Sequence, residues 1–385
     1  MTIGFLSINS KSISYSVLLD KVGHECLFFD SDQNLLENLS NKIFLSEESE
    51  LQLSLSVSKK ILAKSDVTEV IKNSDLIFAF IDNKANTDGT IDITEIFGYI
   101  EKFYLCTHLD ILLYNKKFIL STVLNPGDSK ILYEKISQFG LQYGYLPNFL
   151  SEGSIFKSLK ETKFSVIGTN SYDLSKDLSN LLRQIRKQNS EILVMSPESA
   201  ELVKLGISSI VANKIVTANL LGDFMMSMGL EKEIPMVLSS ISKDKRIGEQ
   251  NLIYGLGYGG PHLGKEIRTL SEFAKNKKVE INIFENLDEA NKEHITYLKY
   301  YYMTLNSDKN VPFVFDSLTY KKGTEILEDS QRLKLCLELL DEGYFVNVTE
   351  NLNVTNNLVK LSQTYNNKLK FFKRGTNPEG VKIKV

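Results

Sequence analysis

A glycine-rich loop and several separated basic side chains are the residues whose types best suggest a chemistry. The loop runs from Gly255 to Gly260 and reads Gly-Leu-Gly-Tyr-Gly-Gly. Backbone N–H groups in such a loop can surround phosphate oxygens, and lysine or arginine can supply the opposing charge. Lysines and arginines are distributed along the whole chain, 45 in all. Together these residue types suit a diphosphate ligand.

Each of these features also has a plainer structural interpretation. Lys204 lies in a predicted helix, where a single lysine is usually a solvated surface residue. Arg246 precedes Ile-Gly and could form a local ion pair in a turn. Glycine-rich stretches are usually flexible loops. The residues alone leave both interpretations open.

The candidates for acid–base, thiol and metal chemistry are few. His262 follows the glycine-rich loop, and its imidazole could act as a general base near neutral pH. The remaining histidines and the three cysteines are scattered along the chain, at His24, His108, His294, Cys26, Cys106 and Cys336. This spacing predicts neither a disulfide framework nor a zinc cluster, so we expect no metal site.

Charge and hydropathy limit the possible partners. The chain has 45 basic and 48 acidic residues, a formal charge of −3, so it offers no broad positive field for nucleic acid or anionic lipid. The first 20 residues lack a basic segment followed by a long apolar run, which argues against a signal peptide. No stretch resembles the roughly 18 apolar residues of a membrane span. We therefore expect a cytoplasmic protein without nucleic-acid or membrane partners.

Residues 1–197 alternate between predicted strands and helices. After a first strand, Ile3–Ile8, a helix over residues 10–22 ends at Gly23, which is typical of a left-handed helix stop. The further strands are predicted at Glu25–Phe29, Asp75–Ile81, Lys117–Val123, Phe164–Gly168 and Ile192–Met195. Such alternation implies parallel pairing, and it predicts a Rossmann-like, doubly wound α/β domain.

The rest of the chain predicts two further regions. Residues 198–229 keep helical apolar spacing without a proline, so they predict a helix of about 45 Å that connects domains and could form a dimer surface. A mostly helical central region extends over residues 198–303. Residues 304–385 predict a smaller α/β domain, with strands at Val311–Thr319, Tyr344–Thr349 and Lys368–Lys373, a helix at Ser330–Asp341 and a stop at Gly343.

Short motifs in one order along the chain resemble those of the UDP-glucose/GDP-mannose dehydrogenase family. They are Gly23–Glu25 with Asp30, Ser121–Val123, Leu146–Gly153, Ala200–Leu205, Asp244–Gly248, Gly257–Pro261, and Tyr320–Thr324 with Ser330. The resemblance extends from Ile3 to about Arg374. It implies a dinucleotide domain, a long helix and a nucleotide-sugar domain. It also implies a homodimer that uses two NAD molecules in sequence to oxidise a sugar 6-hydroxyl to a carboxylate, through a thioester on cysteine.

The resemblance also implies roles for individual residues. Nucleotide-sugar positions are occupied here by Phe149, Leu150, Glu152, Lys204, Ser208, Arg246, Tyr258, Gly259, Lys321 and Arg374. Catalytic positions are occupied by Thr122, Lys204, His262 and Glu266. NAD positions are occupied by Ser7, Asn9, Lys11, Asp30 and Thr122. Asp30 suits a ribose hydroxyl, although an aspartate there can equally cap a turn.

Three departures from the family pattern fall on the dinucleotide and catalytic side. The glycines that let a pyrophosphate approach the first turn are replaced by Ser7, Asn9 and Ser12. His262 takes the place of the thioester-forming cysteine, and an imidazole is a poor covalent relay for that step. Glu328 replaces an arginine that faces the dinucleotide phosphates, which turns attraction into repulsion.

These departures favour one of three hypotheses. In the first, the chain is a divergent family member that binds a nucleotide-diphosphate sugar, and the double oxidation is lost or altered. In the second, it is an active NAD-dependent nucleotide-sugar 6-dehydrogenase with atypical residues, in which Thr122 and Lys204 manage proton transfer and His262 acts as base or oxyanion partner. In the third, it is a structural protein that uses the long helix only.

Overall fold

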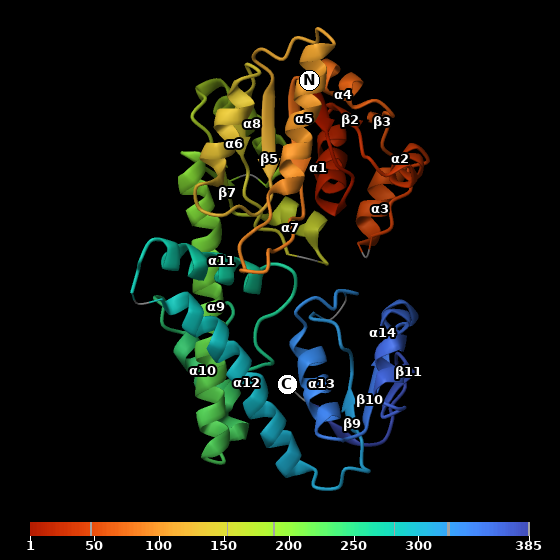
Figure 1. Ribbon diagram of the computed structural model, residues 1–385, viewed down its shortest axis with the longest axis vertical. Helices are drawn as coiled ribbons and strands as arrows, with labels where there is room; N and C mark the ends of the chain where they lie inside the picture. The colour runs from red at the N-terminus through yellow and green to blue at the C-terminus, as the bar shows by residue number, and fades with distance from the viewer. Residues whose placement is uncertain (47, 152, 188, 281, 322–323, 384–385) are drawn as a thin grey trace. The chain divides into compact units, whose positions relative to one another are not determined.

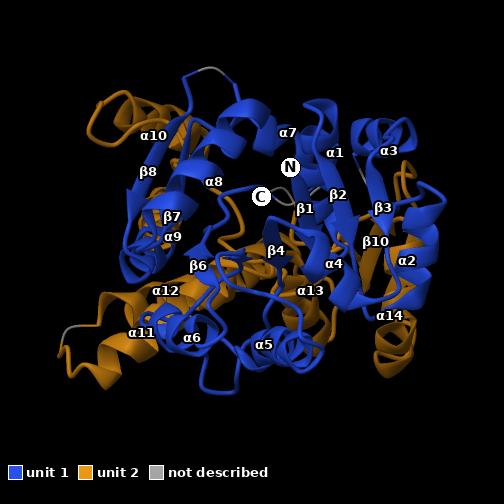
Figure 2. Cartoon of the chain, turned by 90° about the horizontal axis from the view of Figure 1, so that it is seen from above, with its two compact units in different colours: residues 1–206 blue, residues 207–385 orange. Residues whose placement is uncertain are grey.

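A computed structural model describes residues 1–46, 48–151, 153–187, 189–280, 282–321 and 324–383. The chain forms two compact units, residues 1–206 and 207–385 (Figure 2). Each unit has its own sheet and core and is described by itself. The finer division at residues 197 and 303 stays a prediction.

Unit 1 is built on one eight-stranded sheet of order β3-β2-β1-β4-β5-β6-β7-β8. Chain order reverses between β1 and β4, and such a switch point is where open α/β sheets bind ligands. The strands are β1 Thr2–Phe5, β2 Glu25–Phe28, β3 Ile61–Ala63, β4 Leu76–Phe80, β5 Lys117–Ser121, β6 Gln142–Tyr145, β7 Phe164–Gly168 and β8 Glu191–Met195. Every pair is parallel except β6 with β7.

Helices cover both faces of this sheet (Figure 1). One face packs against α1, α3, α7 and α8, and the other against α4, α5, α6 and the start of α9. The helices are α1 Ser10–Lys21, α2 Gln33–Ser40, α3 Ser49–Ser56, α4 Val67–Asn73, α5 Thr94–His108, α6 Asp128–Ser137, α7 Ile155–Glu161 and α8 Tyr172–Ile185. The unit is therefore the doubly wound α/β sandwich that the sequence predicts.

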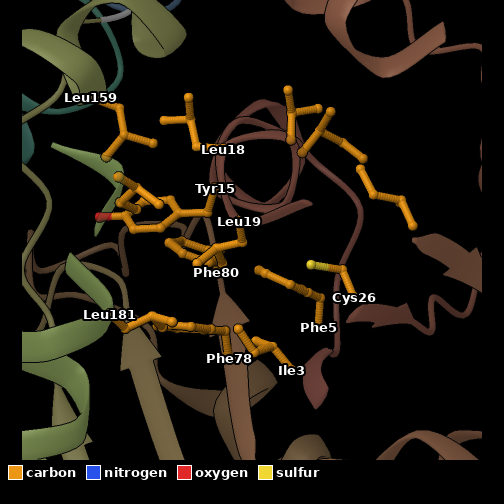
Figure 3. Close-up of a cluster of buried hydrophobic side chains, with 14 of the residues drawn as sticks. Ile3, Phe5, Tyr15, Leu18, Leu19, Cys26, Phe78, Phe80, Leu159 and Leu181 are labelled. Carbon is orange, nitrogen blue, oxygen red and sulfur yellow. The ribbon is translucent and has the colours of Figure 1, made fainter. Parts of the chain in front are cut away.

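Stacked aromatic rings fill the core beneath α1 (Figure 3). The ring of Phe5 lies 4.6 Å from that of Phe28 and 5.5 Å from that of Phe78. Tyr15 of α1 covers Phe80 at 5.0 Å. Parallel strands with helices on both faces are buried throughout, which explains why β1 and β4 read as continuous apolar runs.

The strand predictions for this unit are confirmed in position, with shorter ends. β1 stops at Phe5 and β5 at Ser121, so Leu6–Ile8 and Thr122–Val123 lie in the loops at the carboxyl ends of these strands. The expectation of purely parallel pairing is wrong at β6, whose Tyr145 pairs antiparallel with Gly168 of β7. β3 and β6 were not predicted, because β3 has three residues and β6 reads Gln-Tyr-Gly-Tyr, without a β-branched residue.

Helix α9, Pro197–Ser227, is the long helix predicted from the sequence (Figure 1). It contains an 18-residue window of mean hydropathy 1.3 with at most two charged residues, so the expectation that no segment is apolar enough to cross a membrane is wrong for this helix. Core helices pass the same test. Glu201, Asn219 and Asp223 are buried and hydrogen-bonded to other parts of the protein, as expected of a helix inside a folded domain.

Unit 2 has helices around a four-stranded parallel sheet of order β11-β10-β9-β12. The strands are β9 Phe313–Phe315, β10 Val346–Glu350, β11 Leu369–Lys373 and β12 Val381–Lys382. After α9 come η1 Glu231–Glu233, α10 Ile234–Ser242, α11 Leu263–Asn276, α12 Ile283–Leu305, α13 Gln331–Asp341 and α14 Leu352–Thr364. The helix predicted at Ser330–Asp341 is confirmed as α13, with Ser330 as its N-cap that accepts the Leu333 N–H, and the predicted stop Gly343 has φ +93°. α14 and β12 were not predicted.

Candidate functional site

The turn between β1 and α1 is filled by its own side chains. Asn9 is the N-cap of α1, and its Oδ1 accepts the N–H groups of Lys11 at 3.1 Å and Ser12 at 3.0 Å. Its Nδ2 donates to the Phe80 carbonyl at 2.9 Å. Free N–H groups at this end of a helix are what a phosphate needs. In this turn, two of those donors are already bonded to Asn9.

The other residues predicted for the cofactor also bond to the protein here. Ser7 is buried and donates to the Phe80 carbonyl at 2.8 Å. Lys11 forms an ion pair with Asp82. Asp30 accepts the N–H groups of Ile8 at 2.8 Å and Asp32 at 2.9 Å, which is the turn-capping alternative left open by the sequence. In the conformation described, the turn does not fit a pyrophosphate.

Thr122 lies directly after β5, at the carboxyl edge of the first sheet. Its side chain is buried, and among the described residues its Oγ1 has no hydrogen-bond partner. Its carbonyl accepts the Tyr145 hydroxyl at 3.0 Å. An unsatisfied buried hydroxyl is disfavoured unless something binds it. Thr122 is therefore a predicted binding residue of unit 1 whose side chain is buried without a partner among the described residues.

The segment Leu146–Gly153 supplies two predicted sugar-nucleotide residues of unit 1. Phe149 is half-buried, with its ring 5.0 Å from that of Phe164, and the Lys204 ammonium lies 5.9 Å from its centre. Leu150 is also half-buried, and its N–H donates to Asn148 at 3.2 Å. Glu152, also predicted to bind substrate, lies outside the described residues. The structure thus brings Lys204 to Phe149 by a cation–π contact.

In unit 2 the glycine-rich loop is packed too tightly for side chains at three positions. Gly257 has φ +91°, and an added Cβ there would collide with Asn291. At Gly259 it would collide with the backbone oxygen of Asp329, and at Gly260, φ +83°, it would come within 2.5 Å of the Tyr320 ring. The loop thus packs closely against Tyr320 and Asp329, and whether it is also mobile stays open between the two interpretations.

Tyr258 of this loop faces the core instead of the surface. It is buried in a cluster with Ala212, Val216 and Ile267, and its hydroxyl donates to Asp288 at 3.4 Å. Burial, with Asp288 nearby, raises the pKa of the Tyr258 hydroxyl. Its side chain therefore fixes the loop, and the backbone of the loop is what remains for a ligand.

Helix α11 begins at the proposed catalytic positions. His262 is its half-buried N-cap residue, and Glu266, one turn later, is fully buried. The Ser208 hydroxyl donates to Glu266 Oε2. The structure thus joins two of the predicted residues, a buried carboxylate and a serine hydroxyl.

Arg246 behaves as the structural alternative expects. Its side chain is 88% exposed and forms a two-pronged pair with Asp244, Nη2 to Oδ2 at 2.6 Å and Nε to Oδ1 at 3.0 Å. Asp244 raises the pKa of Arg246. In the described part of unit 2 its partner is Asp244, two residues earlier in the chain.

A pocket of about 330 Å³ lies at the carboxyl edge of the second sheet. It is lined by Arg374, which follows β11, and by Thr324, which lies three residues after the exposed Lys321. Arg332, on the first turn of α13, lines it as well. Glu350, at the end of β10, accepts the Ser317 hydroxyl at 2.7 Å and the Leu318 N–H at 3.0 Å, which holds the loop after β9. The two arginines share the pocket with the carboxylates of Asp316 and Glu350, and arginine at such an edge can bind an anionic ligand.

Arg332 and Arg268 are the charged residues that the sequence reasoning missed. Arg332 Nη1 donates to the Thr319 carbonyl at 3.4 Å, and its Nε lies 4.0 Å from Asp316. Its signal was available, since it follows Ser330, the serine of the Tyr320–Thr324 motif, by two residues. Arg268 Nη1 lies between Asp288, at 3.4 Å, and Asp329, at 3.9 Å. Nothing in the sequence places these two carboxylates together.

None of the three cysteines is a nucleophile of this site. Cys26, Cys106 and Cys336 are free and buried, in β2, α5 and α13. Burial raises the pKa of all three thiols, that of Cys106 to about 11. Since the thiolate is the reactive form, these residues are structural.

Comparison with known proteins identifies the family of this chain. Residues 13–186 match the model of the UDP-glucose/GDP-mannose dehydrogenase family, NAD binding domain, and residues 198–293 match that of its central domain. The chain belongs to the UDP-glucose/GDP-mannose dehydrogenase family. The family resemblance predicted from the motifs is thereby confirmed, and unit 1 is a domain of the NAD-binding type.

Individual relatives of this family member agree. A UDP-glucose 6-dehydrogenase of Rickettsia bellii is 26% identical over 364 residues, which cover 92% of this chain and 82% of the relative. A GDP-mannose 6-dehydrogenase of Pseudomonas aeruginosa is 24% identical over 300 residues, 74% of this chain and 65% of the relative. The solved UDP-glucose dehydrogenase of Pyrobaculum islandicum has the same fold, with TM-score 0.84 at 19% identity, covering 97% of this chain and 86% of its own.

Proposed function

We propose that this family member binds a nucleotide-diphosphate sugar, and that the thioester-mediated double oxidation is lost or altered. The observation that carries the proposal is the contrast between the two units. In unit 1, Asn9 occupies the N–H groups at the start of α1. In unit 2, the glycine-rich loop packs closely against the Tyr320 ring. Thr324, four residues later, and Arg374 line the same pocket.

The cofactor follows from the same contrast. The NAD-binding domain match makes NAD the expected dinucleotide of the family. We infer that this chain binds NAD weakly, because Asn9 would have to release Lys11 and Ser12, and Asp30 is engaged with Ile8. Glu328, which takes the place of the family arginine, is exposed.

The alternative function is an NAD-dependent nucleotide-sugar 6-dehydrogenase with atypical residues. The observation that favours it is the buried, unsatisfied hydroxyl of Thr122, at a catalytic position of the family. The buried carboxylate of Glu266 with Ser208 also keeps the polarity of an active site. In such an enzyme His262 could act as a base but not as the covalent nucleophile.

Ligand binding separates the two functions. UDP-glucose, GDP-mannose and NAD are added separately at increasing concentration, the shift in melting temperature is measured, and absorbance of NADH is followed on mixing. A ligand at about 100 times its Kd stabilises the fold by about 2.7 kcal/mol. We expect stabilisation by a sugar nucleotide, little by NAD, and no NADH. Strong NAD stabilisation with NADH formation would instead support the dehydrogenase.

A variant of the proposed pocket makes this test specific. Arg374→Met removes one cation from the pocket at the second sheet and should abolish most of the stabilisation by the sugar nucleotide. Arg183→Met is the matched control, because Arg183 is an exposed arginine on α8 of the other unit. Equal stabilisation of both variants would contradict the assignment of this pocket.

We also propose that the protein is a cytoplasmic homodimer. Its support is a row of exposed apolar side chains on α9: Ile210 is 65% exposed, Phe224 61% and Leu220 38%. Large apolar side chains gathered on one helix of a protein usually mark an interface.

A further inference from the structure

A buried histidine–aspartate pair contacts the start of the glycine-rich loop. His294 of α12 is 2% exposed, and its Nδ1 lies 2.8 Å from Oδ2 of Asp223 on α9. Its Nε2 lies 2.6 Å from the carbonyl oxygen of Gly255, the first residue of the loop. The two side chains thus join α9, α12 and the loop within unit 2.

Both nitrogens of this ring face acceptor atoms. A carbonyl oxygen accepts hydrogen bonds only, and so does an ionised carboxylate. A neutral imidazole has one N–H, so one ring nitrogen would point its lone pair at an oxygen. Because this is unfavourable in a buried site, a proton must lie at each nitrogen. An imidazolium beside an ionised carboxylate satisfies both contacts.

The groups around the pair support this charge distribution. The Tyr254 hydroxyl donates to Asp223 Oδ1 at 2.8 Å, which stabilises the carboxylate. Tyr297 donates to the Asp223 carbonyl at 3.0 Å. Burial and Asp223 raise the pKa of the Tyr254 hydroxyl, so it stays a donor. These two tyrosines, with Asp223, are the titratable groups with described contacts to the pair from the loop, α12 and α9.

The backbone of the loop is held at both ends by side chains of the same two helices. The Gly255 N–H donates to Asn219 Oδ1 at 2.9 Å, so both polar groups of this residue's backbone are bonded to side chains. At Tyr258, the N–H donates to Asn291 Oδ1 and the carbonyl accepts from Asn291 Nδ2, each at 2.9 Å. Of these four bonds, only the one from His294 Nε2 to the Gly255 carbonyl would have a charged donor. Charge-assisted hydrogen bonds are the stronger kind.

We propose that His294 and Asp223 are positioning residues, a charged pair that holds the glycine-rich loop in its ligand-binding conformation. The inference rests on the proposed function, in which that loop binds the nucleotide-diphosphate sugar. Three glycines of this loop already require a close-packed backbone. Glycine residues lose more conformational freedom on ordering than any others, so the loop needs additional bonds to hold one conformation. The pair supplies such bonds.

The protonation state is tested first, without ligand. The protein is labelled with ¹⁵N in its histidine rings, and the four ring systems are assigned by elimination with His24→Gln, His108→Gln and His262→Gln. We expect His294 to show protons on both ring nitrogens at neutral pH. A single neutral tautomer at His294 would overturn the inference.

The positioning role is tested with His294→Gln and the near-isosteric Asp223→Asn, against His108→Gln, an exposed histidine of unit 1. Amide hydrogen exchange should become faster at residues 255–258 in both variants, while α11 keeps the exchange of the unmodified chain. If the ordered loop falls to about a tenth of the population, UDP-glucose or GDP-mannose affinity falls about ten-fold. The double variant should bind no worse than either single one, because the pair acts as a unit.

The outcomes are distinguishable from a failure of the proposed function. If the unmodified chain binds neither sugar nucleotide, the proposed function is wrong, and the ligand-free exchange and NMR results still decide whether the pair positions the loop. If the unmodified chain binds and both variants bind equally well with unchanged loop exchange, the positioning role is wrong. Should His294→Gln not fold, Asp223→Asn and the NMR of the unmodified chain remain decisive.

Discussion

Asn9 changes which groups of the turn between β1 and α1 are available to a ligand. A glycine there would leave the N–H groups of Lys11 and Ser12 for a phosphate, whereas the asparagine bonds both of them and the Phe80 carbonyl. The capping interaction stabilises α1 by the same donors that a dinucleotide would need. Folding and cofactor binding therefore compete at this residue.

Asn9→Gly tests this competition. Glycine is a tolerable N-cap that costs a few tenths of a kcal/mol, and the lost bond to Phe80 costs about 1 kcal/mol more. We expect a lower melting temperature but a larger stabilisation by NAD than in the unmodified chain. Asn351→Gly is the control, because Asn351 caps α14 through Val354 in unit 2. No gain in NAD stabilisation would show that Asn9 does not limit binding.

At the scale of elements, α9 is anchored to unit 1 by a buried carboxylate. Glu201 is fully buried and accepts the N–H groups of Gly127 at 2.7 Å and Ser129 at 2.6 Å, at the start of α6. The glutamate of the family motif in Ala200–Leu205 thus caps a neighbouring helix, and its negative charge complements the helix dipole. Burial raises its pKa, although both N–H bonds act in the opposite direction.

Glu201→Gln should destabilise unit 1 by roughly 1–3 kcal/mol, since the amide nitrogen faces one of the two N–H donors and leaves it unsatisfied. Exposed Glu191→Gln is the control. The raised pKa means that the folded chain binds more protons than the unfolded one, so this group loses stability as pH rises above about 4.3, the ordinary glutamate value. The urea-unfolding free energy of the unmodified chain relative to the variant should therefore decline over that range. A rising difference would contradict the raised pKa.

For the molecule as a whole, each unit repeats one architectural principle. The second sheet is parallel throughout, and the first is parallel except between β6 and β7. In both, the strand order runs outward from an inner strand, β1 in the first and β9 in the second. Both place their polar candidates at the carboxyl edge, Thr122 after β5 and Arg374 after β11. Several large apolar side chains of α9 nevertheless remain exposed.

Phe224→Asp tests the proposed homodimer. Phe224 is 61% exposed on α9, and a carboxylate there would be buried without a partner in an interface formed by this helix. Light scattering coupled to size exclusion should give a dimer mass for the unmodified chain and a monomer mass for the variant. Tyr172→Asp, at a 78% exposed position of unit 1, is the control. A monomeric unmodified chain would contradict the proposal.

The sequence by itself determined the fold class, the order of elements and the family, because apolar periodicity and short motifs are local properties of the chain. It also indicated the altered turn at Ser7–Ser12 and the loss of a cysteine beside the glycine-rich loop. β3 and β6 escaped it, since β3 has only three residues and β6, Gln-Tyr-Gly-Tyr, has no β-branched residue.

Only the tertiary structure decided which side chains act together. Asn9 and Phe80 are 71 positions apart, as are Asp223 and His294, and no local pattern predicts such contacts. Arg246 matched a motif, yet its side chain is turned to Asp244 and the exterior. A site depends on directions and distances between elements far apart in the chain, and packing fixes these only when the whole unit folds.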